Sequence, residues 1–399
     1  MTFFADTKKL PPDALLQLIT DFRNDPSPDK IDLGVGVYQD ENGKTPIFEA
    51  VELAQRRLQA DEESKTYLGP LGWPGLADEV RKLVLGTTLE EKLADRFAVL
   101  PTPGSSGALK STGTLVHRLN AAAKIWLPDP TWANHIPIFQ SCDLVTKTYA
   151  YYDNDATSLD REKMYADLEK ADAGDVIVVH GACHNPTGED LSAEDWQYLT
   201  TLALEKGIVP FIDIAYQGLG QGFEEDMENV RGLLDVVPEA IICYSFSKNM
   251  GLYRERVGAA LVLTENTEIA GRVQSNLNEI ARRSYSMPPS YGGALAWYVL
   301  SDPDLNASWR KELEQMRKRV LSLRCQVTDA LSAEFGDNRF QYIKSQNGMF
   351  SRLPLEPEQI AQLKSEASIY MAGDGRVNMC GFTPTKIARF TDLLVKVAK

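Results

Sequence analysis

From about residue 96 onward, short apolar runs alternate with longer polar stretches of helical periodicity. This alternation constrains the fold strongly, because strands separated by helices pair in parallel and need helices on both faces of the sheet. Seven apolar runs fit the pattern: 97–101, 123–127, 144–149, 176–180, 209–213, 241–245 and 258–263. The chain is therefore predicted to be α/β, with a large domain built on a seven-stranded, mostly parallel sheet covered by helices.

The remaining segments predict a second, smaller unit. Three early stretches have helical periodicity: 11–24, 47–60 and 74–86. Residues 31–38 are a short extended segment with two glycines, and a long charged helix is expected at about 305–334. Because 399 residues exceed one simple core, we expect a large domain at 46–313 and a smaller α+β domain made of 1–45 and 314–399.

Charge and cysteine usage exclude several classes of protein. The net charge of −14 makes the chain a poor candidate for binding nucleic acid or an anionic membrane. No stretch approaches 18 apolar residues, and the N-terminus has no apolar core of a signal peptide. The five cysteines are odd in number and far apart, which argues against a disulfide framework or a zinc site. We expect a cytoplasmic protein without a metal.

Two ionisable residues stand at the ends of neighbouring apolar runs. Lys248 follows the run 241–245, and Asp213 ends the run 209–213. A carboxylate in so apolar a run needs a cationic partner or must lose its charge, and a structural ion pair is the alternative explanation. Ligands of such sheets lie beyond the carboxyl ends of the strands. An acid and a semi-buried amine there suit pyridoxal phosphate: the amine forms the Schiff base, and the acid keeps the pyridine nitrogen protonated.

Other strand ends carry groups that suit an anionic aromatic ligand. The segment Gly104-Ser-Ser-Gly opens a helical pattern, whose free N–H groups fit a phosphate, although ordinary capping serines would look the same. Trp132 can stack on a flat ring or belong to a core. Asn185 lies in an Asn-Pro-Thr-Gly turn and can point its amide at a ring hydroxyl, and Tyr216 can face the same cavity as Asp213. Arg256 can return to the phosphate as a bidentate donor.

Two histidines follow the fourth predicted strand. His180 and His184 are four residues apart and could bind a metal ion. Because no nearby acidic or cysteine residue completes a ligand set, we favour hydrogen bonding behind the ligand for both.

Together these residues resemble the fold-type I aminotransferases, in particular the aspartate/aromatic subgroup. The similarity runs nearly end to end, and its most specific segments are Lys65-Thr-Tyr-Leu-Gly, Cys183-His-Asn-Pro-Thr-Gly, Asp213-Ile-Ala-Tyr-Gln-Gly and Ser245-Phe-Ser-Lys-Asn. The resemblance implies pyridoxal 5'-phosphate as cofactor, amino acids and 2-oxo acids as substrates, and a homodimer with shared active sites.

The resemblance also implies roles at matching positions. Lys248, Asp213, Tyr216 and Trp132 would be catalytic, with His135 supporting Asp213 from behind. The remaining cofactor contacts would come from Ser105, Ser106, Asn185, Ser245, Arg256 and, from the other subunit, Tyr67. The substrate would contact Gly36, Trp132, Asn185 and Arg376, with Arg282 reaching a distal carboxylate from the partner chain.

Some positions depart from the pattern of the subgroup. Ser105 and Ser106 replace a Gly-Thr pair, and a serine can still donate to a phosphate. Thr66 and Met287 stand where many aspartate-specific relatives have asparagine, which favours aromatic substrates, whereas Arg282 favours dicarboxylates. We therefore predict that both classes of amino acid are used.

Several alternatives stay open at this point. A strict aspartate aminotransferase, a non-transaminating lyase with the same cofactor, and a binding module on the same fold are compatible with the residues above. The pair Ser245 and Lys248 also fits a serine acyl-transfer element, but the accompanying Ser-Asp-Asn and Lys-Thr-Gly motifs do not occur in the sequence.

Overall fold

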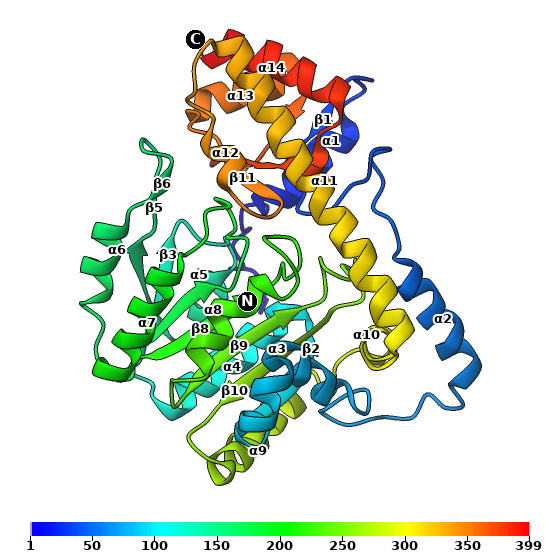
Figure 1. Cartoon of the computed structure of the whole chain (residues 1–399), viewed down its shortest axis with the longest axis vertical. Helices are drawn as coiled ribbons and strands as arrows, with labels where there is room; N and C mark the ends of the chain where they lie inside the picture. The colour runs from blue at the N-terminus through cyan, green and yellow to red at the C-terminus, as the bar shows by residue number, and fades with distance from the viewer. Residues whose placement is uncertain (1, 399) are drawn as a thin grey trace.

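The computed structural model describes residues 2–398, and its centre is a seven-stranded sheet (Figure 1). In spatial order the strands are β2 (Phe97–Pro103), β10 (Val257–Leu263), β9 (Ala240–Ser245), β8 (Val209–Ile214), β7 (Val176–His180), β3 (Lys124–Asp129) and β4 (Val145–Ala150). Strand β10 is antiparallel to both of its neighbours, and the other pairs are parallel. The predicted α/β class and the mostly parallel sheet are confirmed.

Helices cover both faces of the sheet, as its apolar strands require. Alternate residues of a strand point to opposite faces, so in β9 Cys243 and Tyr244 belong to two different buried clusters. The Cys243 cluster includes residues of α4 (Gly104–Leu119), α5 (His135–Gln140) and α9 (Thr267–Ser284). The Tyr244 cluster includes residues of α3 (Leu76–Leu93), α6 (Arg161–Leu168), α7 (Ala193–Lys206) and α8 (Glu225–Leu234).

A long helix connects the sheet region to the rest of the chain. Helix α11 (Pro303–Phe335) packs against α2 (Glu49–Asp61) and α10 (Ser290–Ser301) beside the sheet (Figure 1). It begins where the Asp302 side chain accepts the N–H groups of Asp304 and Leu305, and it ends at Gly336 in the left-handed conformation. The predicted helix 305–334 is confirmed to within two residues at its start.

The far end of α11 carries a smaller group of elements (Figure 1). These are α1 (Ala14–Asn24), β1 (Ile31–Asp32), α12 (Tyr342–Ser345), β11 (Phe350–Arg352), α13 (Pro357–Ala367), β12 (Ile369–Tyr370), β13 (Arg376–Asn378) and α14 (Pro384–Ala398). Strand β1 pairs in parallel with β12, so the N-terminal segment lies beside the C-terminal part. The domain limits at 45/46 and 313/314 stay predictions, since α11 crosses the second limit without a break.

Several predicted boundaries differ from the structure. Helix α1 begins at Ala14 because Asp13 caps it, and only two residues of the segment 31–38 pair as a strand. The helix predicted at 74–86 continues to Leu93, with a left-handed break at Gly86. A short hairpin of β5 (Tyr152–Asp153) and β6 (Ser158–Leu159) and two 3-10 turns, Ala94–Arg96 and Met379–Gly381, complete the elements of residues 2–398.

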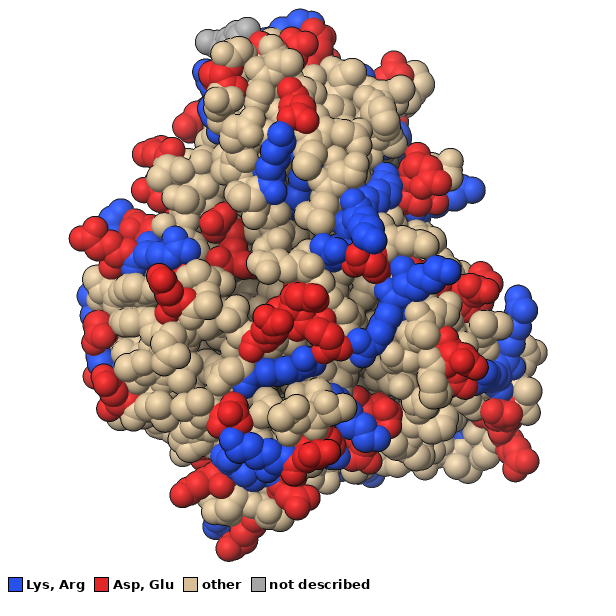
Figure 2. All heavy atoms as spheres, in the orientation of Figure 1, with Lys and Arg blue, Asp and Glu red and all other residues tan. Residues whose placement is uncertain are grey.

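The surface shown in Figure 2 carries charges of both signs, and the cysteines are not paired in disulfides. Acidic and basic side chains are interspersed over the face shown in Figure 2. The five cysteines are free, four of them buried. Within residues 2–398, no helix combines the length and the apolar character needed to cross a membrane.

Candidate active site

The predicted site residues gather at the carboxyl ends of the parallel strands. Asp213 of β8 lies in register between His180 of β7 and Cys243 of β9. The loop after β9 brings Lys248, and the segment after β3 brings Trp132 and His135 to the same edge. The parallel sheet therefore places at one edge residues that are far apart in the sequence.

Asp213 is held by a hydrogen-bonded chain from behind. Its side chain is 4% exposed, and Oδ2 lies 3.1 Å from Nε2 of His135, whose Nδ1 lies 2.7 Å from the Thr131 hydroxyl. Because a carboxylate only accepts, Nε2 donates to it, as the predicted supporting role of His135 requires. Burial by itself would raise the pKa of Asp213, but the His135 hydrogen bond and nearby positive groups outweigh burial and lower it. The carboxyl group stays ionised.

The other oxygen of Asp213 has no hydrogen-bond partner among residues 2–398. Oδ1 is buried and makes no hydrogen bond within the described part of the chain. An unpaired buried carboxylate oxygen is costly, so its place suits a ligand that brings a proton donor.

Lys248 supplies an amine of unusual acidity. The side chain is half-buried, and Nζ lies 5.0 Å from the centre of the Tyr216 ring. Burial lowers the pKa of Lys248 to about 8; the charges of Arg256 and Arg376 also lower it, and Asp213 opposes them. The amine thus loses its proton far more easily than an exposed lysine. Burial also raises the pKa of Tyr216, so its hydroxyl stays protonated.

A cradle for an anion forms at the start of α4. Gly104 has a φ of +69°, and a Cβ atom there would collide with Nη2 of Arg256. Arg256 donates to the Ser247 hydroxyl at 3.4 Å, and Ser245 Oγ accepts from the Ser247 N–H at 3.2 Å. Ser105 and Ser106 occupy the first turn of α4, where backbone N–H groups are free of helical partners. The predicted phosphate residues are thus brought together.

A second guanidinium, that of Arg376, also lies near Lys248. Nη1 of Arg376 donates to Oδ1 of Asn185 at 3.1 Å, and Nη2 donates to the Gly34 carbonyl at 2.9 Å. Nε of Arg376 is buried and unpaired among residues 2–398. The structure therefore brings Arg376 and Asn185 together, as predicted, with one donor left for an anion.

Phe350 is a site residue that the sequence analysis missed. Arg376 lies 4.5 Å above its ring, Tyr216 meets it edge-on at 5.9 Å, and a Cβ on Gly36 would lie 3.2 Å from its Cζ. Phe350 thus connects Gly36, Arg376 and Tyr216. A single phenylalanine after Asn347-Gly-Met gives no pattern that separates it from an ordinary core residue.

Hydrogen bonding was predicted for both histidines after β7, and the structure shows it for His184 alone within the described residues. His184 Nδ1 lies 2.8 Å from the Thr187 hydroxyl, and its ring stacks on Tyr151. The prediction that His180 forms hydrogen bonds is wrong, since neither of its ring nitrogens has a hydrogen-bond partner in the described residues. Its ring packs instead against His135 and His184, and burial lowers its pKa to about 3. The ligand atoms of His135, His180 and Asp213 lie within 4.8 Å of one another, a set not considered from the sequence.

Three predicted residues lie at the rim or on the surface. Trp132 is half-buried, with its edge against the His135 ring at 5.3 Å. Tyr67 is 92% exposed, and Arg282 is exposed and donates to the Ser286 hydroxyl. The roles of Tyr67 and Arg282 in a neighbouring subunit stay predictions.

Comparison with known proteins identifies the family. Residues 28–394 match the family model described as aminotransferase class I and II. The chain belongs to this aminotransferase family. It is similar to the tyrosine aminotransferase of Rhizobium meliloti (strain 1021), with 43% identity over 96% of this chain and 97% of that protein. The aspartate aminotransferase of Escherichia coli (strain K12) is 38% identical, over 99% of this chain and 100% of that protein.

A solved structure supports the same conclusion. The aromatic-amino-acid aminotransferase from Burkholderia pseudomallei, covalently bound to pyridoxal phosphate, superimposes with a TM-score of 0.96 and 35% identity over 100% of both chains. The family and fold predicted from the sequence are confirmed, and this aminotransferase uses pyridoxal phosphate. The unpaired Oδ1 of Asp213, the amine of Lys248 and the cradle beside Gly104 fit that cofactor.

Proposed function

We propose that this aminotransferase moves an amino group between an aromatic or dicarboxylic L-amino acid and a 2-oxo acid such as 2-oxoglutarate. One observation carries the proposal. An amine of lowered pKa, Lys248, and an ionised buried acid with a free oxygen, Asp213, stand at the ends of adjacent strands. Relatives named for tyrosine, for aromatic amino acids and for aspartate support both substrate classes.

The chain's own residues divide the work of the reaction. When bound, pyridoxal phosphate supplies an aldehyde that condenses with amines and a ring that withdraws electrons. Asp213 Oδ1 would hold a proton on the ring nitrogen, while Tyr216 and Asn185 would donate to the ring oxygen and Trp132 would cover the ring. The free N–H groups of α4, the hydroxyls of Ser105, Ser106 and Ser245, and Arg256 would bind the phosphate.

Lys248 would also move the proton of the reaction. Since burial and two arginines lower its pKa to about 8, its Nζ can take the proton from the substrate Cα near neutral pH and return it. Arg376 would bind the substrate α-carboxylate through its unpaired Nε, with Gly36 and Asn185 beside it.

The partner subunit would complete the site. We place Tyr67 at the phosphate of the neighbouring subunit and Arg282 at the distal carboxylate of a dicarboxylic substrate. The exposure of both residues on one protomer supports a homodimer. The same proposal takes residues 46–313 as the large domain, 1–45 with 314–399 as the small one, and the cytoplasm as the location.

Borohydride reduction tests the central assignment. Treatment of the holoenzyme, followed by peptide mass analysis, is expected to find the cofactor attached at Lys248, and Lys248→Ala should carry none. Attachment at another lysine, or no attachment in the native protein, would remove the basis of the proposal.

A donor panel with 2-oxoglutarate tests the substrate range. Arg282→Ala should lower kcat/KM for aspartate by about 100-fold, because a buried carboxylate loses its charge partner. Phenylalanine and tyrosine should lose far less. Arg283→Ala is the matched control, since Arg283 is also exposed but pairs with Glu279. Equal losses for both donor classes would contradict the role of Arg282.

A further inference from the structure

The hydroxyl of Tyr244 joins the two chain segments that carry Tyr216 and Lys248. Tyr244 lies on β9 and is fully buried. Its hydroxyl donates to Oε1 of Gln217 at 2.7 Å and accepts from Nδ2 of Asn249 at 2.8 Å. Gln217 directly follows Tyr216, and Asn249 directly follows Lys248. One hydroxyl thus connects the neighbours of two proposed site residues.

The direction of these hydrogen bonds is fully determined. The Gln217 amide nitrogen donates to the Phe223 carbonyl at 2.9 Å, so its oxygen faces Tyr244 as an acceptor. The tyrosine hydroxyl must then donate to Gln217, and its lone pair receives the Asn249 amide. Gln217 and Asn249 are also fully buried. Burial raises the pKa of Tyr244, so the hydroxyl keeps its proton.

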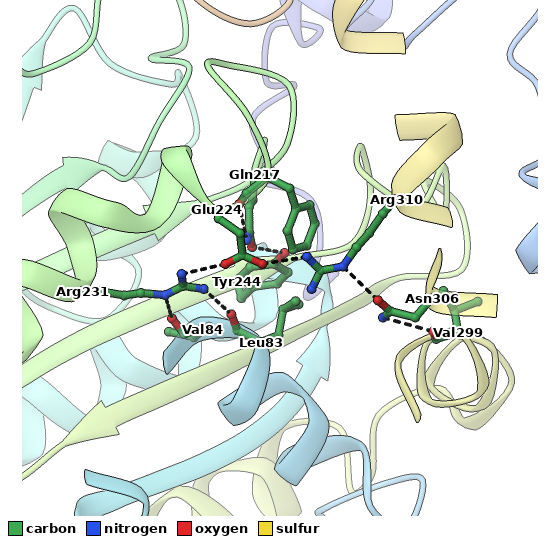
Figure 3. Close-up of polar contacts among 10 residues, drawn as sticks. Leu83, Val84, Gln217, Glu224, Arg231, Tyr244, Val299, Asn306 and Arg310 are labelled. Carbon is green, nitrogen blue, oxygen red and sulfur yellow. Dashed lines mark hydrogen bonds and ion pairs between the residues drawn. The ribbon is translucent and has the colours of Figure 1, made fainter. Parts of the chain in front are cut away.

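The same network reaches the long helix α11. Trp309 of α11 donates through Nε1 to the Asn249 carbonyl, and Phe223 meets the Trp309 ring edge-on at 5.1 Å. Figure 3 shows Tyr244 and Gln217 beside Glu224, which binds Arg310 of α11 at 2.6 Å and Arg231 of α8 at 2.7 Å. The Lys248 loop is therefore bound to α11 through the Asn249 carbonyl, and the segment after Gln217 packs against the same helix through Phe223.

Removal of the Tyr244 hydroxyl would leave buried groups without partners. Oε1 of Gln217 and Nδ2 of Asn249 would each lose the hydrogen bond that Tyr244 makes. Oδ1 of Asn249 is already unpaired within residues 2–398, so this amide has little else to hold it. The loop would then relax, and the direction of the adjacent Lys248 side chain would change.

We propose that Tyr244 is a positioning residue, which holds the Lys248 loop against the Tyr216 turn from the far face of the sheet. The inference rests on the proposed function, because it concerns the placement of Lys248 toward the cofactor. Tyr244 belongs to the buried cluster of α3, α7 and α8, on the opposite side of β9 from Cys243. Its loss should therefore affect the proton-moving step and not substrate binding.

The test compares Tyr244→Phe with the native holoenzyme. The midpoint of the pH titration of the visible absorbance, which reports the proton held at the Lys248 nitrogen, should move by at least about 0.5 pH units. The kcat value should fall by roughly 10- to 100-fold at nearly constant KM, as misplacement of a reacting group predicts. A merely structural role would lower stability without moving the titration.

A matched control and a second variant make the outcome decisive. Tyr149→Phe also removes a buried tyrosine hydroxyl from the sheet, one that donates to the Val178 carbonyl at 2.8 Å. This control should lose stability and keep the native titration and kcat. Gln217→Met removes the acceptor of the Tyr244 hydroxyl and should move the titration midpoint in the same direction as Tyr244→Phe. This variant tests the positioning role if Tyr244→Phe does not fold.

The outcomes separate this inference from the proposed function. Native titration and kcat in both network variants, with Lys248 still labelled by borohydride, would overturn the positioning role alone. An equal shift in Tyr149→Phe would overturn it as well. Absence of any label at Lys248 in the native protein would overturn the proposed function itself.

Discussion

Replacement of Lys248 by methionine should stabilise the cofactor-free protein at neutral pH. The native site holds an amine whose pKa burial lowers from the ordinary 10.5 to about 8. Each pKa unit is worth about 1.36 kcal/mol, so the charged amine costs roughly 3 kcal/mol of folding free energy at pH 7. Methionine has a similar length and carries no charge, so Lys248→Met removes this cost.

The sign of the pH dependence follows from the same values. Between about pH 8 and pH 10.5 the unfolded chain keeps the lysine proton that the folded chain has released. The unfolding free energy of the native protein therefore rises with pH in this window. Below pH 8 both states are charged and the full cost applies; above 10.5 both are neutral and it is gone. The advantage of Lys248→Met should shrink accordingly.

Urea unfolding of the cofactor-free proteins measures this difference. Native protein and Lys248→Met are compared at pH 7 and pH 10 and at one protomer concentration, because subunit association changes apparent stability. Lys311→Met, at an exposed position of α11, is the control and should shift stability by less than about 0.5 kcal/mol. Equal stability of Lys248→Met and native protein at pH 7, or a difference that does not shrink at pH 10, would refute the reasoning.

Two further substitutions test the anion cradle at Gly104 and the buried hydrogen bonds that Arg324 of α11 makes to the segment 347–350. Gly104→Ala should weaken pyridoxal phosphate binding by at least roughly tenfold in a cofactor titration, because a Cβ there collides with Arg256. Gly207→Ala shares the positive φ, but its Cβ would meet no atom of residues 2–398 within 4 Å, so comparable weakening there would contradict the explanation. Arg324→Met should cost about 3 kcal/mol or more in urea unfolding, because the buried guanidinium holds the carbonyls of Asn347, Gly348 and Phe350. A loss below about 1 kcal/mol would argue against that role.

Much of the candidate site could be predicted from the residues at the strand ends alone. Asp213 and Lys248 follow apolar runs, and the carboxyl ends of parallel strands share one edge of a sheet. A carboxylate in such a run needs a stabilising partner, which proved to be His135 at 3.1 Å. The local pattern of apolar residues can therefore identify a site residue when that residue is buried because it belongs to a strand.

Residues that act through contacts between distant segments left no such signal. Phe350 joins Arg376 to Tyr216, and Tyr244 joins Gln217 to Asn249, yet each looks like an ordinary core aromatic in the sequence. The same holds for His180, whose ring nitrogens were expected to form hydrogen bonds but have no partner among residues 2–398.

By itself the amino-acid sequence determined the fold class, the long helix and the position of Lys248 and Asp213 at strand ends, because periodicity and burial of single strands are local properties. Tertiary structure alone decided which oxygen of Asp213 stays free, how far the pKa of Lys248 falls, and which groups fasten its loop. These properties depend on desolvation and on distances between segments far apart in the chain, and such distances exist only after the sheet and the helices have packed together.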